Sequence, residues 1–464
     1  MSNYSFLKKS CFLTLSSLIF PLSVVSPISL WIPLFLSSVI LFLFHEKKSF
    51  IFNKPSNLEL LLLVFLTYSI SSIFWTNNFS FAIKKIFEFL VFCLCFKILL
   101  ESSKEFSFKD SLKNVLTYSF IITTSIVLID LYFVLGIKPW LSINFDNMFN
   151  PDLNNQEKIS YTDFKNNYGK GMYSGSYSRG LATLSVFSFI VMACNLQKRF
   201  MLFAIVILSS LTIFLGESIT SKAAFSISAF IVLLLFKNKK IFTTMLLFFL
   251  FLYLLFIPVI VKYFDAYDWS KTRQINELNL WNVNREIERM EKKYPYKIQY
   301  NLLIEKYYHT ILIRLDHRLA VWKYTSEKIF QKFLFGHGIY SSKKLGEIDK
   351  VGLIEYNFAS DVNKYKAYAA IPLHPHNNAL QIWLELGLFG VVIFIIFLAS
   401  LFKKLLTNSC LNKSSYSLIT GSLFCIIIIN QSSFGLWQFW WLSVISYWVI
   451  FTNIFYNFSK PLQK

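Results

Sequence analysis

The chain has 464 residues, of which 55% are hydrophobic, 19% aromatic and 16% charged, with a mean hydropathy of +0.49 and a net charge of +20. This balance is too apolar for a soluble globular domain and is typical of a protein that crosses a membrane several times. The basic residues lie mostly in short gaps between apolar runs, which suits the anionic cytoplasmic surface of a membrane, and no nucleic-acid partner is expected.

Apolar runs long enough to cross a bilayer recur along the chain. About 20 apolar residues span the hydrocarbon core, and shorter runs can cross when flanking side chains reach the interface. The first run follows a lysine pair like a signal peptide, but no clear cleavage site follows it, so we expect a retained span. The sequence predicts an all-α polytopic membrane protein with about 12 transmembrane helices. Their predicted ranges are 11–27, 29–44, 58–75, 82–100, 114–136, 179–196, 199–215, 221–236, 240–262, 379–402, 416–431 and 434–456.

Lysine and arginine predict the orientation of these spans. Alternate gaps are basic, whereas of the short gaps between them TNN and NQSS carry no lysine or arginine. The positive-inside rule places the basic gaps and both termini in the cytoplasm. Two long gaps then face outward, at about 137–178 and about 263–378, and the longer one should fold and carry function. We therefore divide the chain into nine spans over 1–262, a large, partly helical periplasmic loop over 263–378, and three spans over 379–464.

Two of the six histidines lie where the large loop re-enters the membrane, in the stretch HPHNNALQIWLELGLFG. Pro375 restricts His374 to an extended conformation and removes one backbone donor. Asn377 or Asn378 can cap the following helix, whose N-terminus favours an anion. A histidine near its own pKa is a usable general base, so His376 and His374 are candidate catalytic residues. A purely structural role as a polar helix cap fits the pattern equally well.

Charged residues in apolar surroundings are the other candidates. Arg314, Arg318 and Trp322 are spaced four apart and share one face of a predicted helix in the large loop. Such a face either anchors a helix at the membrane surface or contributes to a site. Glu385 lies about two turns into the tenth span and must face the protein interior. Asp130, inside the fifth span, is a second membrane carboxylate to which the sequence assigns no role.

Several motifs match one family together. HPHNNALQIWLELGLFG resembles the histidine–asparagine motif and glutamate–glycine tail of the O-antigen ligase family of bacterial inner-membrane glycosyltransferases. RLAVW and FGHGIY are similar to the arginine-x-x-x-tryptophan and glycine-x-glycine elements of that family's large periplasmic loop. Lys222 in TSKAAF stands where the family usually has arginine, and it keeps the charge but lacks the bidentate fork. Arg179 in YSRGLA is therefore an alternative phosphate-binding cation. The motifs cover residues 215–400, and the span layout extends the resemblance over the whole chain.

The resemblance implies transfer of a glycan from undecaprenyl diphosphate to a sugar hydroxyl of lipid A–core, without metal or cofactor and with inversion of the anomeric carbon. It implies His376 as the preferred base, with His374 beside it. The donor diphosphate would be bound by Arg318 together with Arg179 or Lys222. Supporting roles fall to Arg314, Trp322, Asn377 and Glu385. The partners would be the lipid-linked donor, the lipid A–core acceptor and membrane lipids, at the periplasmic face of the bacterial inner membrane.

Two other functions compete with this interpretation. An O-antigen polymerase would use the same donor but lengthen the glycan, and the sequence separates the two poorly. A flippase or transporter of lipid-linked glycans would be expected to show repeated halves and charged residues along a central cavity. Here no repeat is evident, and the informative polar residues gather toward one face, which favours an enzyme.

Overall fold

The computed structural model describes residues 3–45, 54–104, 106, 108–133, 135, 137–138, 177–263, 318–348, 350–357, 362–408 and 411–456. Before residue 264 the helices are α1 (Asn3–Val25), η1 (Pro27–Leu30), α2 (Trp31–Phe44), α3 (Asn57–Ser71), η3 (Ser72–Trp75), α4 (Phe79–Ser103), α5 (Lys109–Phe133), α10 (Ser178–Cys194), α11 (Arg199–Leu215), α12 (Ile219–Lys237) and α13 (Lys239–Lys262). After it come helical residues 318–331, α16 (Ser341–Ile348), β1 (Lys350–Asn357), β2 (Val362–Ala369), α17 (Asn378–Leu406), α18 (Lys413–Asn430) and α19 (Phe439–Tyr456).

The all-α polytopic class is confirmed. Each of the apolar runs picked out in the sequence contains a helix, and nine described helical segments are long and apolar enough to cross a membrane. Three predicted spans are not among these nine. Helices α10 and α11 have only 17 residues each, and α4 carries five charged side chains over its 25 residues. The chain is therefore a membrane protein, and the full number of spans stays a prediction.

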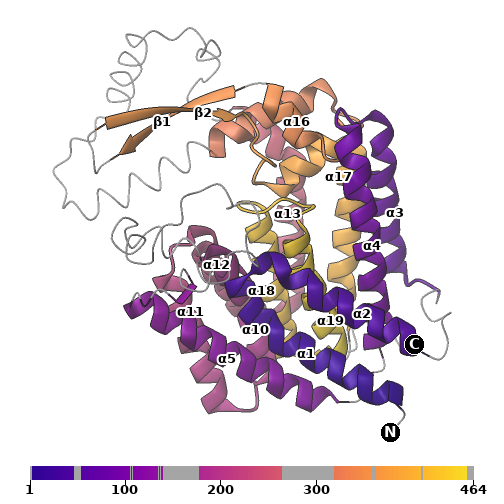
Figure 1. Cartoon of the computed structure of the whole chain (residues 1–464), viewed down its shortest axis with the longest axis vertical. Coiled ribbons are helices and arrows are strands. Elements are labelled where there is room, and N and C mark those ends of the chain that lie inside the picture. The colour runs from indigo at the N-terminus through magenta and orange to yellow at the C-terminus, as the bar shows by residue number, and fades with distance from the viewer. Residues whose placement is uncertain are drawn as a thin grey trace. The chain divides into compact units, whose positions relative to one another are not determined.

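The large loop between α13 and α17 is partly helical, but it also contains a hairpin that was not expected from the sequence. Strands β1 and β2 pair antiparallel, with Lys350 opposite Ala369 and Asn357 opposite Val362 (Figure 1). Residues 264–317 of this loop, which include Arg314, lie outside the described residues. Residues 139–176 of the shorter loop do so too.

The chain divides into two compact units. The first comprises Met1–Leu60, Phe87–Phe248 and Leu398–Lys464, and the second comprises Leu61–Ile86 and Phe249–Phe397. Every contact described below lies within one of these two units.

Helix α10 is the centre of the first unit and packs against α1, α5, α11, α12, α18 and α19 (Figure 1). Every residue from Gly180 to Ala193 is buried. Small residues permit this crowding, because a Cβ on Gly180 would come within 3.0 Å of the Val24 backbone in α1. The hydroxyl of Ser422 in α18 donates to the Val186 carbonyl at 2.7 Å, so this buried hydroxyl is paired inside the bundle.

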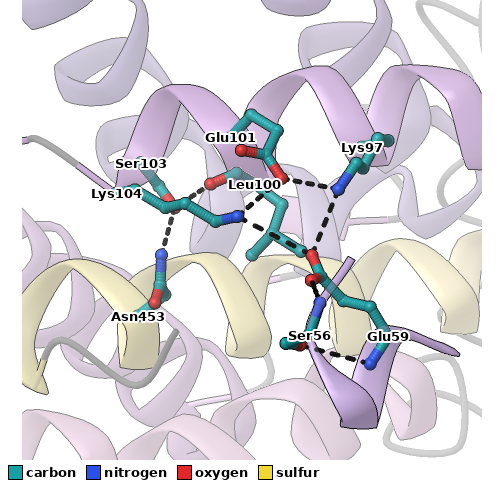
Figure 2. Close-up of polar contacts among 8 residues, drawn as sticks. All are labelled: Ser56, Glu59, Lys97, Leu100, Glu101, Ser103, Lys104 and Asn453. Carbon is teal, nitrogen blue, oxygen red and sulfur yellow. Dashed lines mark hydrogen bonds and ion pairs between the residues drawn. The ribbon is translucent and has the colours of Figure 1, made fainter. Parts of the chain in front are cut away.

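A buried ion cluster joins α3 and α4 in the same unit (Figure 2). The Glu101 side chain, only 2% exposed, accepts from Lys97 at 2.5 Å and from Lys104 at 2.6 Å. Both lysines also face Glu59 near the start of α3, at 3.2 and 3.8 Å. One turn of α3 is thus fixed to the end of α4 by opposite charges that have little access to water.

In the second unit, α13 and α17 are fixed to each other through a proline. Pro258 has no backbone N–H, so the Leu254 carbonyl four residues earlier lacks its usual helical donor. The indole of Trp383 in α17 donates to that carbonyl at 2.7 Å. The Pro258 carbonyl in turn accepts from Ser326, in helical residues 318–331, at 2.6 Å. These contacts hold α13 and helical residues 318–331 beside the first turns of α17.

Candidate active site

The site is built around the turn that precedes α17. Trp322 donates its indole N–H to the Pro375 carbonyl at 2.8 Å, which ties helical residues 318–331 to the histidine stretch. His376 has a φ of 56°, in the left-handed region that a residue with a Cβ rarely adopts. Backbone strain of this kind persists only where the surroundings enforce it, and it often accompanies function.

The two histidines are in different states. His374 is buried, and its Nδ1 accepts the backbone N–H of His376 at 3.1 Å. Burial, with a smaller contribution from the neighbouring His376, lowers the pKa of His374 to about 3. His374 is therefore neutral at physiological pH, with its proton on Nε2. His376 is only half-buried, and its ring centroid lies 4.5 Å from that of His374.

Asn377 is the N-cap, which settles the alternative that the sequence left open. Its Oδ1 accepts the backbone N–H of Leu380 at 3.0 Å, and its Nδ2 donates to the Tyr253 hydroxyl of α13 at 2.8 Å. Asn378 follows as the first residue of α17 and is 3% exposed. Among the described residues, neither its amide nitrogen nor its amide oxygen has a hydrogen-bond partner. A buried amide in this condition lacks the compensation that most buried polar groups have.

Glu385 lies inside the protein, as expected, and organises the loop opposite α17. Its carboxylate accepts from the side chains of Gln381 and Ser342 and from the backbone N–H of Tyr340. Its backbone carbonyl also accepts from Gly338 at 2.8 Å. Glu385 therefore fixes the turn at residues 338–342 against α17.

Glycines permit this close approach. Gly336 and Gly387 have φ values of 69° and 65°, and Gly387 makes a non-helical break within α17. A Cβ on Gly336 would meet the Glu385 backbone at 2.5 Å, and one on Gly387 would meet the Leu334 carbonyl at 2.4 Å. The close neighbour of Gly387 is therefore the backbone of the turn at residues 334–336.

Residues of η3 and the position after it also support this loop, and they were not identified from the sequence. Ser72 accepts the backbone N–H of Ile339 at 2.8 Å, and Thr76 donates to its carbonyl at 2.8 Å. Trp75 donates to the Phe335 carbonyl at 3.2 Å. The short gap after this span was read only as an uncharged outer turn, and no signal in one sequence links it to residues more than 250 positions away.

The predicted cations divide between the two units. Arg318 opens helical residues 318–331, one turn before Trp322 on the same face, in the unit that holds both histidines. Arg179 and Lys222 belong to the other unit. Arg179 is exposed at the start of α10, and Lys222 lies in the first turn of α12, which Ser218 caps. Within the described residues, His, Cys, Asp and Glu side chains form no group of three or more that could hold a metal ion.

Comparison with known proteins gives three matches. Residues 203–395 match the model of a family described as O-antigen ligase. A protein of Rickettsia conorii described as a candidate polysaccharide ligase is 30% identical over 57% of this chain and 54% of its own length. One of Rickettsia felis with the same description is 29% identical over 60% and 57%. The matched part thus spans about half the length of these relatives. No solved structure matches the chain.

Proposed function

We propose that the chain, whose residues 203–395 match the O-antigen ligase family model, transfers a glycan from undecaprenyl diphosphate to a sugar hydroxyl of lipid A–core. The proposed reaction is independent of metal ions and inverts the anomeric carbon. The observation that carries the proposal is the asymmetric histidine pair at the start of α17. Because both substrates are anchored in lipid, the proposed site lies at the periplasmic face of the bacterial inner membrane.

His376 is the proposed general base. The acceptor oxygen attacks the anomeric carbon while the bond from that carbon to the diphosphate breaks, and the hydroxyl proton passes to His376. His374 is a poor base because its Nδ1 already accepts a hydrogen bond and burial holds its pKa at about 3. Its Nε2 proton suits it to donate to a substrate oxygen.

The leaving diphosphate needs positive charge. Arg318 is the proposed main contact, because a guanidinium binds phosphate oxygens in a bidentate way. The first turn of α17 adds the partial positive charge of a helix N-terminus. Arg179 or Lys222 is the proposed second cation, and Arg314 a supporting one.

Trp322, Asn377 and Glu385 are proposed as positioning residues. The turn at residues 374–377, here called the histidine turn, is held on both sides. Trp322 donates to the Pro375 carbonyl, and Asn377 donates to the Tyr253 hydroxyl. Glu385 holds the turn at residues 338–342. A general base gains its full effect only when its position is fixed, which is why these contacts support the proposal.

The test is transfer from a purified lipid-linked glycan to lipid A–core in liposomes, with chelator present and protein amounts matched. Proton abstraction contributes about 10²–10⁴-fold, so His376→Ala should reduce the rate on that scale. His374→Ala should cost less, and donor binding should survive both changes. His45→Ala, at the end of α2, is a matched control and should transfer normally.

Two outcomes would overturn the assignment. Wild-type transfer by His376→Ala together with loss in His374→Ala would reverse the two roles. Wild-type transfer by both variants would leave the histidine turn as a helix cap only. Growth of polymer on the lipid carrier, without attachment to lipid A–core, would instead identify a polymerase.

A further inference from the structure

Asp130 has no place in the proposed reaction, yet it is completely buried near the end of α5. Its carboxylate accepts the hydroxyl of Tyr177 and, at 3.1 Å, the backbone N–H of Ile137. Ile137 follows α5 and Tyr177 immediately precedes α10, so one carboxylate holds both chain segments together. A buried carboxylate is costly in a membrane protein, and that cost points to a purpose at this place.

The two segments held by Asp130 each carry a cation. Lys138 follows Ile137, and its Nζ lies 5.1 Å from the centre of the Tyr177 ring. Arg179 lies two residues after Tyr177, with its guanidinium 5.6 Å from the centre of the Trp440 ring in α19. Both cations thus lie on aromatic faces that hold them in place.

Lys138 and Arg179 are close enough to repel each other. Burial and, to a smaller extent, the positive charge of Arg179 together lower the pKa of Lys138 to about 8. Within the described residues, Arg179 makes no ion pair with a carboxylate. An anion bound between the two cations would convert their repulsion into attraction, and Arg179 is exposed enough to receive one.

We propose that Lys138 and Arg179 together form a diphosphate-binding site, which Asp130 positions through Tyr177 and the Ile137 backbone. The ligand rests on the proposed function, which supplies a lipid diphosphate as the donor. Two neighbouring phosphates carry two negative charges and match two neighbouring cations, one a bidentate fork and the other a point charge. The inference adds Lys138 to the binding residues and makes Asp130 a positioning residue.

The first test measures binding of undecaprenyl diphosphate to protein in phosphatidylcholine nanodiscs, without acceptor. Losing one charged contact should weaken binding about 10- to 100-fold in Lys138→Ala. Lys138→Arg should retain most of the affinity. Lys198→Ala, beyond the other end of α10, removes the same charge and should bind like wild type. Equal affinity in wild type and Lys138→Ala would overturn the site.

The second test uses pH, because a merely structural lysine would not give this signature. The second phosphate pKa lies near 6, so the probe keeps its charge from pH 7.5 to 9.5. Wild-type affinity should fall over this interval as Lys138 loses its proton, and Lys138→Arg should show no such fall. Arg179, Tyr177 and Asp130, the other charged or titratable groups at the site, are the same in both proteins. Parallel pH profiles would overturn the role of Lys138.

Two further arms separate the possible failures. Asp130→Asn should weaken binding while the pH dependence stays, and wild-type affinity in this variant would remove Asp130 as a positioning residue. If Lys138→Ala lost affinity for phosphatidylglycerol as strongly as for the diphosphate probe, the site would bind lipid headgroups in general and the donor assignment would fall. If wild type bound the probe through Lys138 but transferred no glycan, the site would stand and the proposed function would fail.

Discussion

At the scale of single residues, chemistry depends on which atoms are already occupied. The sequence shows two histidines around a proline, and nothing in it says which nitrogen can accept a proton. The backbone N–H of His376 occupies Nδ1 of His374, which removes one candidate as a base. Burial has the same consequence, because it lowers the pKa of His374 to about 3.

Arg318 gives a prediction at this scale. Arg318→Ala should abolish transfer, and Arg318→Lys should restore only part, because a point charge replaces a bidentate fork. Lys222→Arg should be tolerated or improve the rate for the converse reason. Initial rates over a range of donor concentrations check this, with Lys323→Ala, on the same helix, as the control. Full activity in Arg318→Ala would exclude this arginine from the mechanism.

Some residue roles could be predicted from the sequence and others could not. The N-cap at Asn377 and the interior position of Glu385 follow from local rules about helix starts and membrane charges. The contacts of Gly387 and Asp130 depend on segments that are distant in sequence or in a different element. Hydrophobic periodicity and the spacing of residues within a motif carry no information about such contacts, so only the three-dimensional structure reveals them.

At the scale of elements, the helices were predictable because each is a long apolar run bounded by polar residues. The β1–β2 hairpin was not, because its strands lie in a loop without a marked turn dipeptide. The predicted span 82–100 gave no role to the charged residues at the end of α4. In the structure they form part of the buried ion cluster of Figure 2.

That cluster gives the prediction at the element scale. Glu101→Gln removes the charge shared by Lys97 and Lys104 and leaves Glu59 as the carboxylate that both lysines face among the described residues. Breaking a buried pair costs about 3–5 kcal/mol, and a value near the lower limit is expected because the lysines retain some access to water. Tryptophan fluorescence during heating in detergent should show a clearly lower melting temperature.

The control for Glu101 is a surface pair of the same chemistry. Asp110 lies 3.9 Å from Lys113, and its side chain is 97% exposed. Exposed pairs contribute little, so Asp110→Asn should melt like wild type. Equal shifts in the two variants would show that the cluster is no more than a set of surface charges.

At the scale of the whole molecule, orientation in the membrane decides whether the site can meet its substrates. Helix lengths and hydropathy establish the membrane character, but they are the same for either orientation. The prediction of sidedness therefore rests on the lysine-rich gaps alone. It places α16 in the periplasm and the turn between α12 and α13 in the cytoplasm.

Cysteine labelling tests this orientation directly. In a cysteine-free background, a cysteine replacing Lys343 in α16 should react with an impermeant maleimide in intact spheroplasts, because that side chain is 44% exposed. A cysteine replacing Lys240, which is exposed at the start of α13, should react only after the membrane is permeabilised. The opposite pattern would put the histidine turn on the cytoplasmic side, where a periplasmic lipid-linked donor could not reach it. The proposed reaction would then fail whatever the histidine and arginine variants showed, so this measurement should precede them.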